Sequence, residues 1–143
     1  MSIDETIDEN KITRVAQLAE EFNLRLVIMF GSMAAGKSRP GSDMDIAIQF
    51  EKNEDVGEHS FDIMAGLQGI FPERKVDLAL VNHADPLFLK KILENCELLY
   101  GKRRALAELR MYAFKRYVDH KRFLKMEEEY IRRLLRRHER GAA

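Results

Sequence analysis

Residues 30–46, FGSMAAGKSRPGSDMDI, decide the fold because they join two strand-like segments through a polar loop. The segment before the loop, LRLVIMF at residues 24–30, is a nearly unbroken apolar run of strand length, as expected for a central strand that is covered on both faces. The loop is rich in Gly, Ser and Pro, which are typical turn residues. It opens onto DMDIAIQF at residues 43–50, which we interpret as a second strand.

Two carboxylates begin the second strand, and a third lies on a later one. Asp43 and Asp45 are two residues apart, so both side chains leave the same face of a strand, and the opposite face is apolar. Residues 75–81, KVDLALV, read as a third strand on which Asp77 alternates with apolar residues in the same way. If these strands are neighbours, Asp77 lies beside the other two carboxylates.

A cluster of three carboxylates requires a compensating charge. Two carboxylates about 7 Å apart repel by roughly 2 kcal/mol at an effective dielectric constant of about 20, so the cluster either binds a cation or raises a pKa. Hard oxygen ligands suit Mg²⁺ or Mn²⁺, which also bind substrate phosphates. An Asp-x-Asp motif alone is a weak signal in a chain with 34% charged residues, but the preceding strand and loop make the combination far more specific. We therefore predict a Mg²⁺ (or Mn²⁺) site at Asp43, Asp45 and Asp77.

The loop between the first two strands offers groups that can bind phosphate. Gly31 lets the backbone approach a ligand closely, and exposed N–H groups together with the Ser32 hydroxyl can hold phosphate oxygens. An ordinary tight turn is the alternative for an isolated Gly-Ser pair. Lys37 and Arg39 are either further phosphate ligands or solvent-exposed loop charges, and Ser42 completes the candidate nucleotide-binding set.

The Gly-Ser pair, the ten residues after it and the Asp-x-Asp motif resemble the signature of the nucleotidyltransferase (polymerase beta-like) superfamily. Residues 30–46 as a whole are similar to its minimal branch, the MNT domain, which includes antitoxins encoded beside HEPN-domain toxins. The likeness extends to about residue 101. The resemblance implies the nucleotidyltransferase fold, ATP as substrate, and a triphosphate held by Ser32 and the Gly31 backbone.

The same resemblance implies a reaction and a partner. Asp43 and Asp45 would coordinate two metal ions, and Asp77 would complete one metal site and help to remove the proton of the acceptor. The expected function is transfer of AMP from ATP to a tyrosine hydroxyl of a HEPN-domain toxin, with the chain acting as the antitoxin. The alternatives are transfer to a small molecule such as an antibiotic, and a noncatalytic antitoxin that neutralises its partner by binding.

The chain departs from the family pattern next to the Gly-Ser pair. Relatives often carry a basic residue in this part of the loop, where this chain has Met33 and Ala35. The loss of positive charge could weaken triphosphate binding, and Lys37 and Arg39 could substitute for it.

The remaining patterns complete an α/β (α+β) fold, a small mixed sheet flanked by helices with a long C-terminal helical tail. Apolar residues at three- and four-residue spacings predict helices, and a short strand precedes Gly101; these segments are residues 12–22, 57–71, 85–95 and 102–138 for the helices and 97–100 for the strand. We assign residues 1–101 to a minimal nucleotidyltransferase domain and residues 102–143 to a C-terminal helical extension of the same domain.

The tail has two main interpretations. Either it folds back on the sheet as a helical hairpin with a break near Asp119, or it presents an apolar, basic surface to a protein partner or to a second copy in a homo-oligomer. Residues 1–101 carry a net charge of −8 and residues 102–143 a net charge of +8. Nucleic-acid binding is the weakest alternative, because no aromatic stacking surface accompanies the basic residues.

Several protein classes are excluded by composition. No stretch approaches 18 uninterrupted apolar residues, so we expect no membrane span, and the acidic N-terminus does not resemble a secretory signal. The single cysteine, Cys96, cannot form an internal disulfide, and the histidines show no zinc-site spacing. These features predict a cytoplasmic protein.

Overall fold

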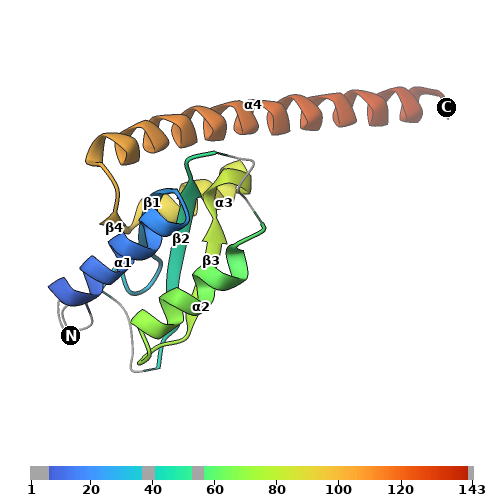
Figure 1. Ribbon diagram of the computed structural model, residues 1–143. Helices are drawn as coiled ribbons and strands as arrows, with labels where there is room; N and C mark the ends of the chain where they lie inside the picture. Colours follow the sequence, from blue (N-terminus) through green and yellow to red (C-terminus); the bar gives the residue numbers. More distant parts are fainter. Residues whose placement is uncertain (1–6, 37–40, 53–56, 142–143) are drawn as a thin grey trace.

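The computed structural model describes residues 7–36, 41–52 and 57–141, and the fold is given for these ranges (Figure 1). The elements follow the order α1 (Glu9–Glu21), β1 (Leu24–Phe30), β2 (Met44–Phe50), α2 (Ser60–Ile70), β3 (Val76–Leu80), η3 (Val81–His83), α3 (Pro86–Glu94), β4 (Cys96–Tyr100) and α4 (Arg103–Gly141). The predicted α/β (α+β) class and the four predicted strands are confirmed, with each strand end shifted by no more than about a residue.

The four strands form one mixed sheet in the order β3-β2-β1-β4. β1 is antiparallel to both of its neighbours, β2 and β4, whereas β2 and β3 are parallel. Six of the seven residues of β1 are buried, because the strand is central and is covered on both faces. The crossover from β2 to β3 is made by α2, as parallel pairing requires.

Two hydrophobic cores lie on opposite faces of the sheet. One core packs α1 and α2 against the sheet and includes Met44, Ile46 and Ile48 of β2. The other packs α3 and the start of α4 against the opposite face and includes Ala47 of β2. Since side chains alternate along a strand, Asp45 emerges on the same face as Ala47, which is the face that α3 and α4 cover.

Helix caps explain where two of the helices begin. The Asp8 side chain accepts a hydrogen bond of 2.8 Å from the backbone N of Lys11, so α1 starts three residues earlier than the apolar spacing predicts. The Asp85 side chain likewise accepts from the backbone N of Phe88 at 2.9 Å, with Pro86 as the first helical residue. Asn23 adopts a φ of +53° and ends α1.

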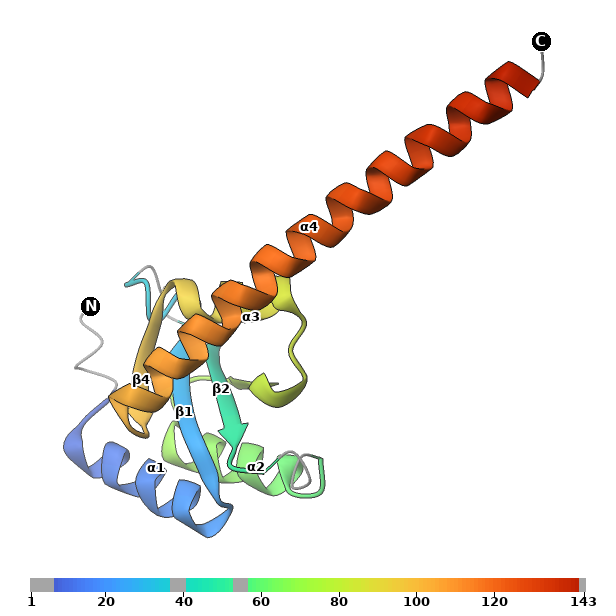
Figure 2. The same cartoon turned by 90° about the horizontal axis from the view of Figure 1, so that it is seen from above.

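The tail is a single helix. α4 contains 39 residues without a break at Asp119, so the hairpin interpretation is wrong. No proline or glycine interrupts residues 102–140, and such residues are the usual cause of a break. Gly101 has a φ of +117°, and a Cβ there would lie 2.6 Å from the Arg25 carbonyl oxygen, so the turn from β4 into α4 requires glycine. Figure 2 shows α4 crossing over the sheet and then leaving the domain.

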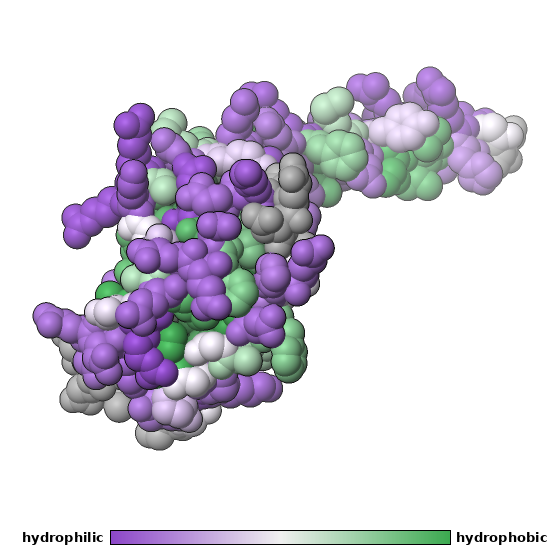
Figure 3. Space-filling view, viewed as in Figure 1, coloured by the Kyte–Doolittle hydropathy of each residue, from purple (hydrophilic) through white to green (hydrophobic). Residues whose placement is uncertain are grey.

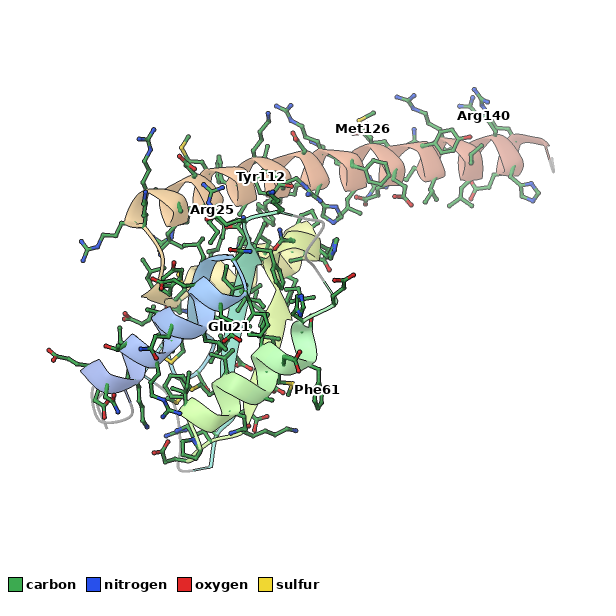
Figure 4. All side chains as sticks on the ribbon, viewed as in Figure 1. Glu21, Arg25, Phe61, Tyr112, Met126 and Arg140 are labelled. Atoms are coloured by element: carbon green, nitrogen blue, oxygen red, sulfur yellow. The ribbon has the colours of Figure 1, made fainter. Side chains whose placement is uncertain are left out.

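Only the first half of α4, to about residue 120, packs against the domain. Its buried residues are Ala105, Leu109 and Ala113, and they contact α3 and β1. Glu108 pairs with Arg25 of β1 at 2.5 Å, and Arg25 rises from the sheet toward α4 beside Tyr112 (Figure 4). No helix in the described ranges combines the length and the apolarity of a membrane span.

Candidate functional site

The structure brings the three predicted carboxylates to one end of the β2–β3 pair. Asp45 of β2 and Asp77 of β3 are directly paired across the parallel strands. Asp43 lies immediately before β2 rather than within it, two residues from Asp45 and therefore close to it. Asp43 and Asp77 are exposed and Asp45 is half-buried, so the cluster faces solvent at the edge of the sheet face that α3 covers.

The pKa of Asp45 reflects the closeness of the three carboxylates. Burial raises the pKa of the Asp45 carboxyl above its ordinary value, and the negative charges of Asp77 and Asp43 raise it further. The Lys91 ammonium on α3 acts in the opposite direction and lowers that pKa. A carboxylate that is disfavoured by its neighbours is stabilised by any cation that binds between them.

The three carboxylates suit a hard divalent cation, although they do not form a complete coordination shell. Among the described residues, no three Asp, Glu, His or Cys side chains are already gathered closely enough to enclose a metal ion. Mg²⁺ commonly takes only one or two carboxylates from the protein and completes its shell with water and substrate phosphates. An open cluster of carboxylates at the solvent edge suits this manner of binding.

Gly31 allows the first loop to approach the carboxylates. It follows Phe30, which is paired with Asp45 across β1 and β2, and it has a φ of +76°. A Cβ at this position would collide with Oδ2 of Asp45 and would lie 3.4 Å from its Cγ. Glycine is therefore required both by the backbone conformation and by the neighbouring carboxylate. The Gly-Ser turn and the predicted metal ligands thus form one site.

The turn after Gly31 explains the departure at Met33. The Ala35 N–H donates to the Gly31 carbonyl at 3.1 Å and the Gly36 N–H donates to the Met33 carbonyl at 3.2 Å, so the loop begins as a short helical turn. This turn leaves Ser32 exposed and buries Met33, which is only 3% exposed, in the core beside α1 and α2. A basic residue at position 33 would bury its charge.

Part of the predicted nucleotide-binding set is outside the described residues. Lys37 and Arg39 fall in this part of the chain, and their roles remain predictions. The Ser42 carbonyl accepts a hydrogen bond of 3.3 Å from Nη1 of Arg74. This bond helps to hold the segment just before β2, which carries Asp43.

Two residues that the sequence analysis missed position the carboxylates. Arg74 is 7% exposed and reaches from the loop before β3 to the segment before β2. Gln68 of α2 donates from Nε2 to the carbonyls of Phe71 (3.0 Å) and Arg74 (2.6 Å), and its Oε1 accepts from the Val76 N–H at 2.9 Å. These bonds fix the loop that leads into Asp77. Neither residue belongs to a motif, so only the tertiary structure reveals its role.

Lys91 is the third residue that the sequence analysis missed. It is exposed on the last turn of α3, and its charge acts on Asp45. The signal that could have indicated it is the placement of α3 on the sheet face that carries the carboxylates. A lysine at this position can attract an anionic ligand to the metal ligands.

A family model agrees with this site. The model described as polymerase beta, nucleotidyltransferase matches residues 10–105, which include the Gly-Ser turn and all three carboxylates. The chain belongs to this nucleotidyltransferase family. The resemblance inferred from residues 30–46 is thereby confirmed at the level of the family and its fold. No protein of curated function matches the sequence significantly.

Solved structures of toxin–antitoxin systems share the fold of this nucleotidyltransferase. A chain of a toxin–antitoxin crystal structure with AMP-PNP is 20% identical with a TM-score of 0.64, and the match covers 90% of this chain and 99% of that chain. A chain of the tri-AMPylated Shewanella oneidensis HEPN toxin in complex with the MNT antitoxin is 16% identical with a TM-score of 0.58, over 87% and 95% of the two chains. A chain of an MntA–HepT toxin–antitoxin structure is also 16% identical, with a TM-score of 0.59 over the same shares. At these identities the likeness establishes the fold.

Proposed function

We propose that this nucleotidyltransferase transfers AMP from ATP to a tyrosine hydroxyl of a HEPN-domain toxin and thereby acts as its antitoxin. The observation that carries the reaction is the direct pairing of Asp45 and Asp77 beside the Gly31 turn. This pairing supports the proposal because the candidate metal ligands and the candidate phosphate-binding turn are close neighbours.

Each part of the site has a role in the proposed reaction. The Gly31 backbone and the Ser32 hydroxyl hold triphosphate oxygens, and Lys91 adds positive charge beside Asp45. Asp43, Asp45 and Asp77 hold Mg²⁺ (or Mn²⁺), which when bound neutralises the negative charge of the phosphates. Lys37 and Arg39 are predicted to extend the triphosphate contacts.

The chemistry follows from this arrangement. Asp77 accepts the proton of the tyrosine hydroxyl, whose oxygen then attacks the α-phosphorus. A new P–O bond forms to the tyrosine, the bond between the α-phosphorus and the bridging oxygen breaks, and pyrophosphate leaves with the electron pair. Most of the rate enhancement in such a reaction comes from positioning and from stabilisation of the developing charge.

The choice of acceptor rests on the solved relatives. One relative assembly contains AMP-PNP and another contains a tri-AMPylated HEPN toxin with its MNT antitoxin. The compact domain offers little additional structure for a small-molecule acceptor, whereas the long, exposed α4 provides surface for a protein.

A transfer assay tests the proposal. The full chain is incubated with α-labelled ATP, Mg²⁺ and a purified HEPN-domain toxin, and label is expected on the toxin. Asp45→Asn should reduce the rate by about 100-fold or more, because it removes a metal ligand. Asp62→Asn, which changes an exposed carboxylate on α2, is the matched control and should label the toxin at the wild-type rate.

The noncatalytic alternative gives a different result in the same system. An antitoxin that acts by contact alone would neutralise the toxin equally well as wild type, as Asp43→Asn and as Asp45→Asn. Loss of neutralisation in both variants, with toxin binding retained, supports the transfer reaction.

A further inference from the structure

The distal part of α4 exposes a large apolar surface. Every residue from 121 to 141 is exposed, and residues 114–141 extend for about 40 Å at 1.5 Å per residue. Beyond residue 120, the exposed large apolar residues are Phe123, Leu124, Met126, Tyr130, Ile131, Leu134 and Leu135. Monomeric soluble proteins seldom expose a contiguous apolar surface of this kind without a binding role.

This surface continues the face by which α4 packs on its own domain. At about 100° per residue, Ala105, Leu109 and Ala113 occupy one side of the helix, and the distal apolar residues fall on that same side, in a sector about 180° wide. Figure 3 shows apolar groups gathered on the distal helix, on the side that faces downward in the view. The domain covers this face to about residue 120 and leaves the rest open.

We propose that the apolar face of distal α4, formed by residues 123–135, is the surface on which the acceptor protein docks. The partner supplies an apolar groove between helices, with acidic side chains at its rim and a basic side chain opposite Glu127. This inference rests on the proposed function in taking the acceptor to be a protein, the HEPN-domain toxin. Docking on α4 raises the local concentration of the acceptor hydroxyl near the catalytic domain.

The charge of distal α4 favours an acidic partner over a second α4 helix packed alongside it. Residues 114–141 contain 10 Lys/Arg and 5 Asp/Glu, a net charge of +5, so two copies packed side by side would repel. Arg137 and Lys121 lie at the edges of the apolar sector, where they would meet acidic side chains at the rim of a groove.

The spacing of the apolar residues also disfavours a self-paired coiled coil. A two-stranded coiled coil buries a narrow seam with a seven-residue repeat. A seam that repeats every seven residues through Leu124 and Ile131 would reach His138 next. Its intermediate position, three or four residues after Leu124, would be Glu127 or Glu128. A seam through Phe123 and Tyr130 would continue to Arg137 and bury a guanidinium. A sector this wide suits a groove that contacts the helix from two sides.

Glu127 argues for a protein rather than a lipid surface. It lies near the centre of the apolar sector and is followed by Glu128 and Glu129. A carboxylate among acyl chains is strongly disfavoured, and anionic headgroups would repel it, whereas a basic side chain in a protein groove can form a charge-assisted hydrogen bond with it.

Two variants of equal charge change test the docking surface. Leu124→Glu/Ile131→Glu alters the net charge of the full chain by −2 within the apolar face, and Lys125→Glu alters it by −2 on the opposite face of α4. Both changes replace exposed residues with a good helix former, so the thermal unfolding temperature should stay at the wild-type value. Calorimetric titration into the toxin should show about 100-fold weaker binding for the double variant, and at most about threefold for Lys125→Glu.

The experiment distinguishes failure of the docking proposal from failure of the proposed reaction. Asp45→Asn should bind the toxin as tightly as wild type, although it does not transfer label. If wild type transfers no label but the double variant still loses binding, the proposed reaction is wrong and the docking surface stands. If the double variant binds the toxin with wild-type affinity, the docking proposal is overturned.

Two further measurements test whether another occupant, rather than the acceptor protein, covers the apolar face of distal α4. Sedimentation of the chain alone would reveal a second copy on this face if wild type is a dimer and Leu124→Glu/Ile131→Glu is a monomer. Flotation with vesicles of anionic phospholipid would reveal a lipid surface if wild type binds and the double variant does not. The proposal predicts that wild type is monomeric and does not bind the vesicles.

Discussion

Asp45 on β2 and Asp77 on β3 are partners in the parallel register, so two carboxylates face solvent side by side at the entry to both strands. Asp43 precedes this pair by two residues. The sheet therefore holds three negative charges in one place without a compensating basic residue of its own strands. Lys91, from α3, offsets them only in part. This imbalance leads to predictions about stability and about cation binding.

Replacing Asp45 should stabilise the protein in the absence of metal. The pKa of Asp45 is raised in the folded state. Between the ordinary pKa and the raised one, the folded state therefore binds more protons than the unfolded state. The free energy of unfolding thus falls as the pH rises through that range. Asp45→Asn removes this loss. After allowance for solvent screening we expect a gain of up to about 1 kcal/mol at pH 7.

The pH dependence of unfolding checks the sign of this effect. The difference between Asp45→Asn and wild type should disappear below the ordinary carboxyl pKa, where Asp45 is protonated in both states. Asp119→Asn, which removes an exposed carboxylate from the middle of α4, serves as the control and should not share the gain at pH 7. A destabilised Asp45→Asn protein at pH 7 would show that Asp45 is paired favourably rather than crowded.

Divalent cations should stabilise wild type selectively. Binding to the folded state raises the free energy of unfolding by about 2.7 kcal/mol when the free cation reaches 100 times its Kd, so the unfolding temperature should rise with Mg²⁺ or Mn²⁺. Asp45→Asn and Asp77→Asn should lose most of this increase, and Asp62→Asn should keep it. An equal increase in all four proteins would place the cation elsewhere.

Alanine at Gly31 should cost more than alanine at Gly36. Both glycines have positive φ, +76° and +70°, so both substitutions carry a backbone penalty of about 1–2 kcal/mol. Only at Gly31 does the new methyl group collide with Asp45, whereas at Gly36 no atom of the described residues, apart from the chain neighbours, lies within 4 Å of the position. Urea unfolding should therefore show the larger loss for Gly31→Ala, and Asp45→Ala should relieve part of it. Equal losses would contradict the close approach.

Gln68 should matter for both stability and activity. Gln68→Met removes its bonds to the Phe71 and Arg74 carbonyls and to the Val76 N–H, which should cost about 1–3 kcal/mol and loosen the loop before Asp77. Gln17→Met on the exposed side of α1 is the control. Activity per folded molecule, measured well below the unfolding temperature, should fall for Gln68→Met alone. A stability loss without that fall would make Gln68 structural only.

Local patterns predict most of the fold and part of the site. Three elements can be predicted from a few neighbouring residues each. They are β1 from its apolar run, β2 from the alternation around Asp45, and the start of α3 from the Asp85-Pro86 cap. Asp77 could be assigned from the same alternation once its strand was taken to be a neighbour. The family is indicated by residues 30–46, since the chemistry of phosphate and metal binding requires those residue types at that spacing.

The remaining features depend on contacts between distant segments. Arg74 is important because its guanidinium reaches the Ser42 carbonyl 32 residues away in sequence, and Lys91 because α3 packs on the face that carries Asp45. The hairpin, one of the two interpretations of the tail, rests on the need to cover its apolar residues. The helix instead continues straight, since nothing in its sequence breaks it, and its apolar face remains exposed.

The most direct test of the central claim is the mass of the toxin after incubation with the full chain, ATP and Mg²⁺. We predict that intact-mass spectrometry will show the addition of one or more adenylyl groups on tyrosine, with none in the presence of Asp45→Asn and full modification in the presence of Asp62→Asn. A toxin that is neutralised but unmodified, or that is modified equally by Asp45→Asn, would contradict the assignment of this carboxylate cluster as the catalytic centre.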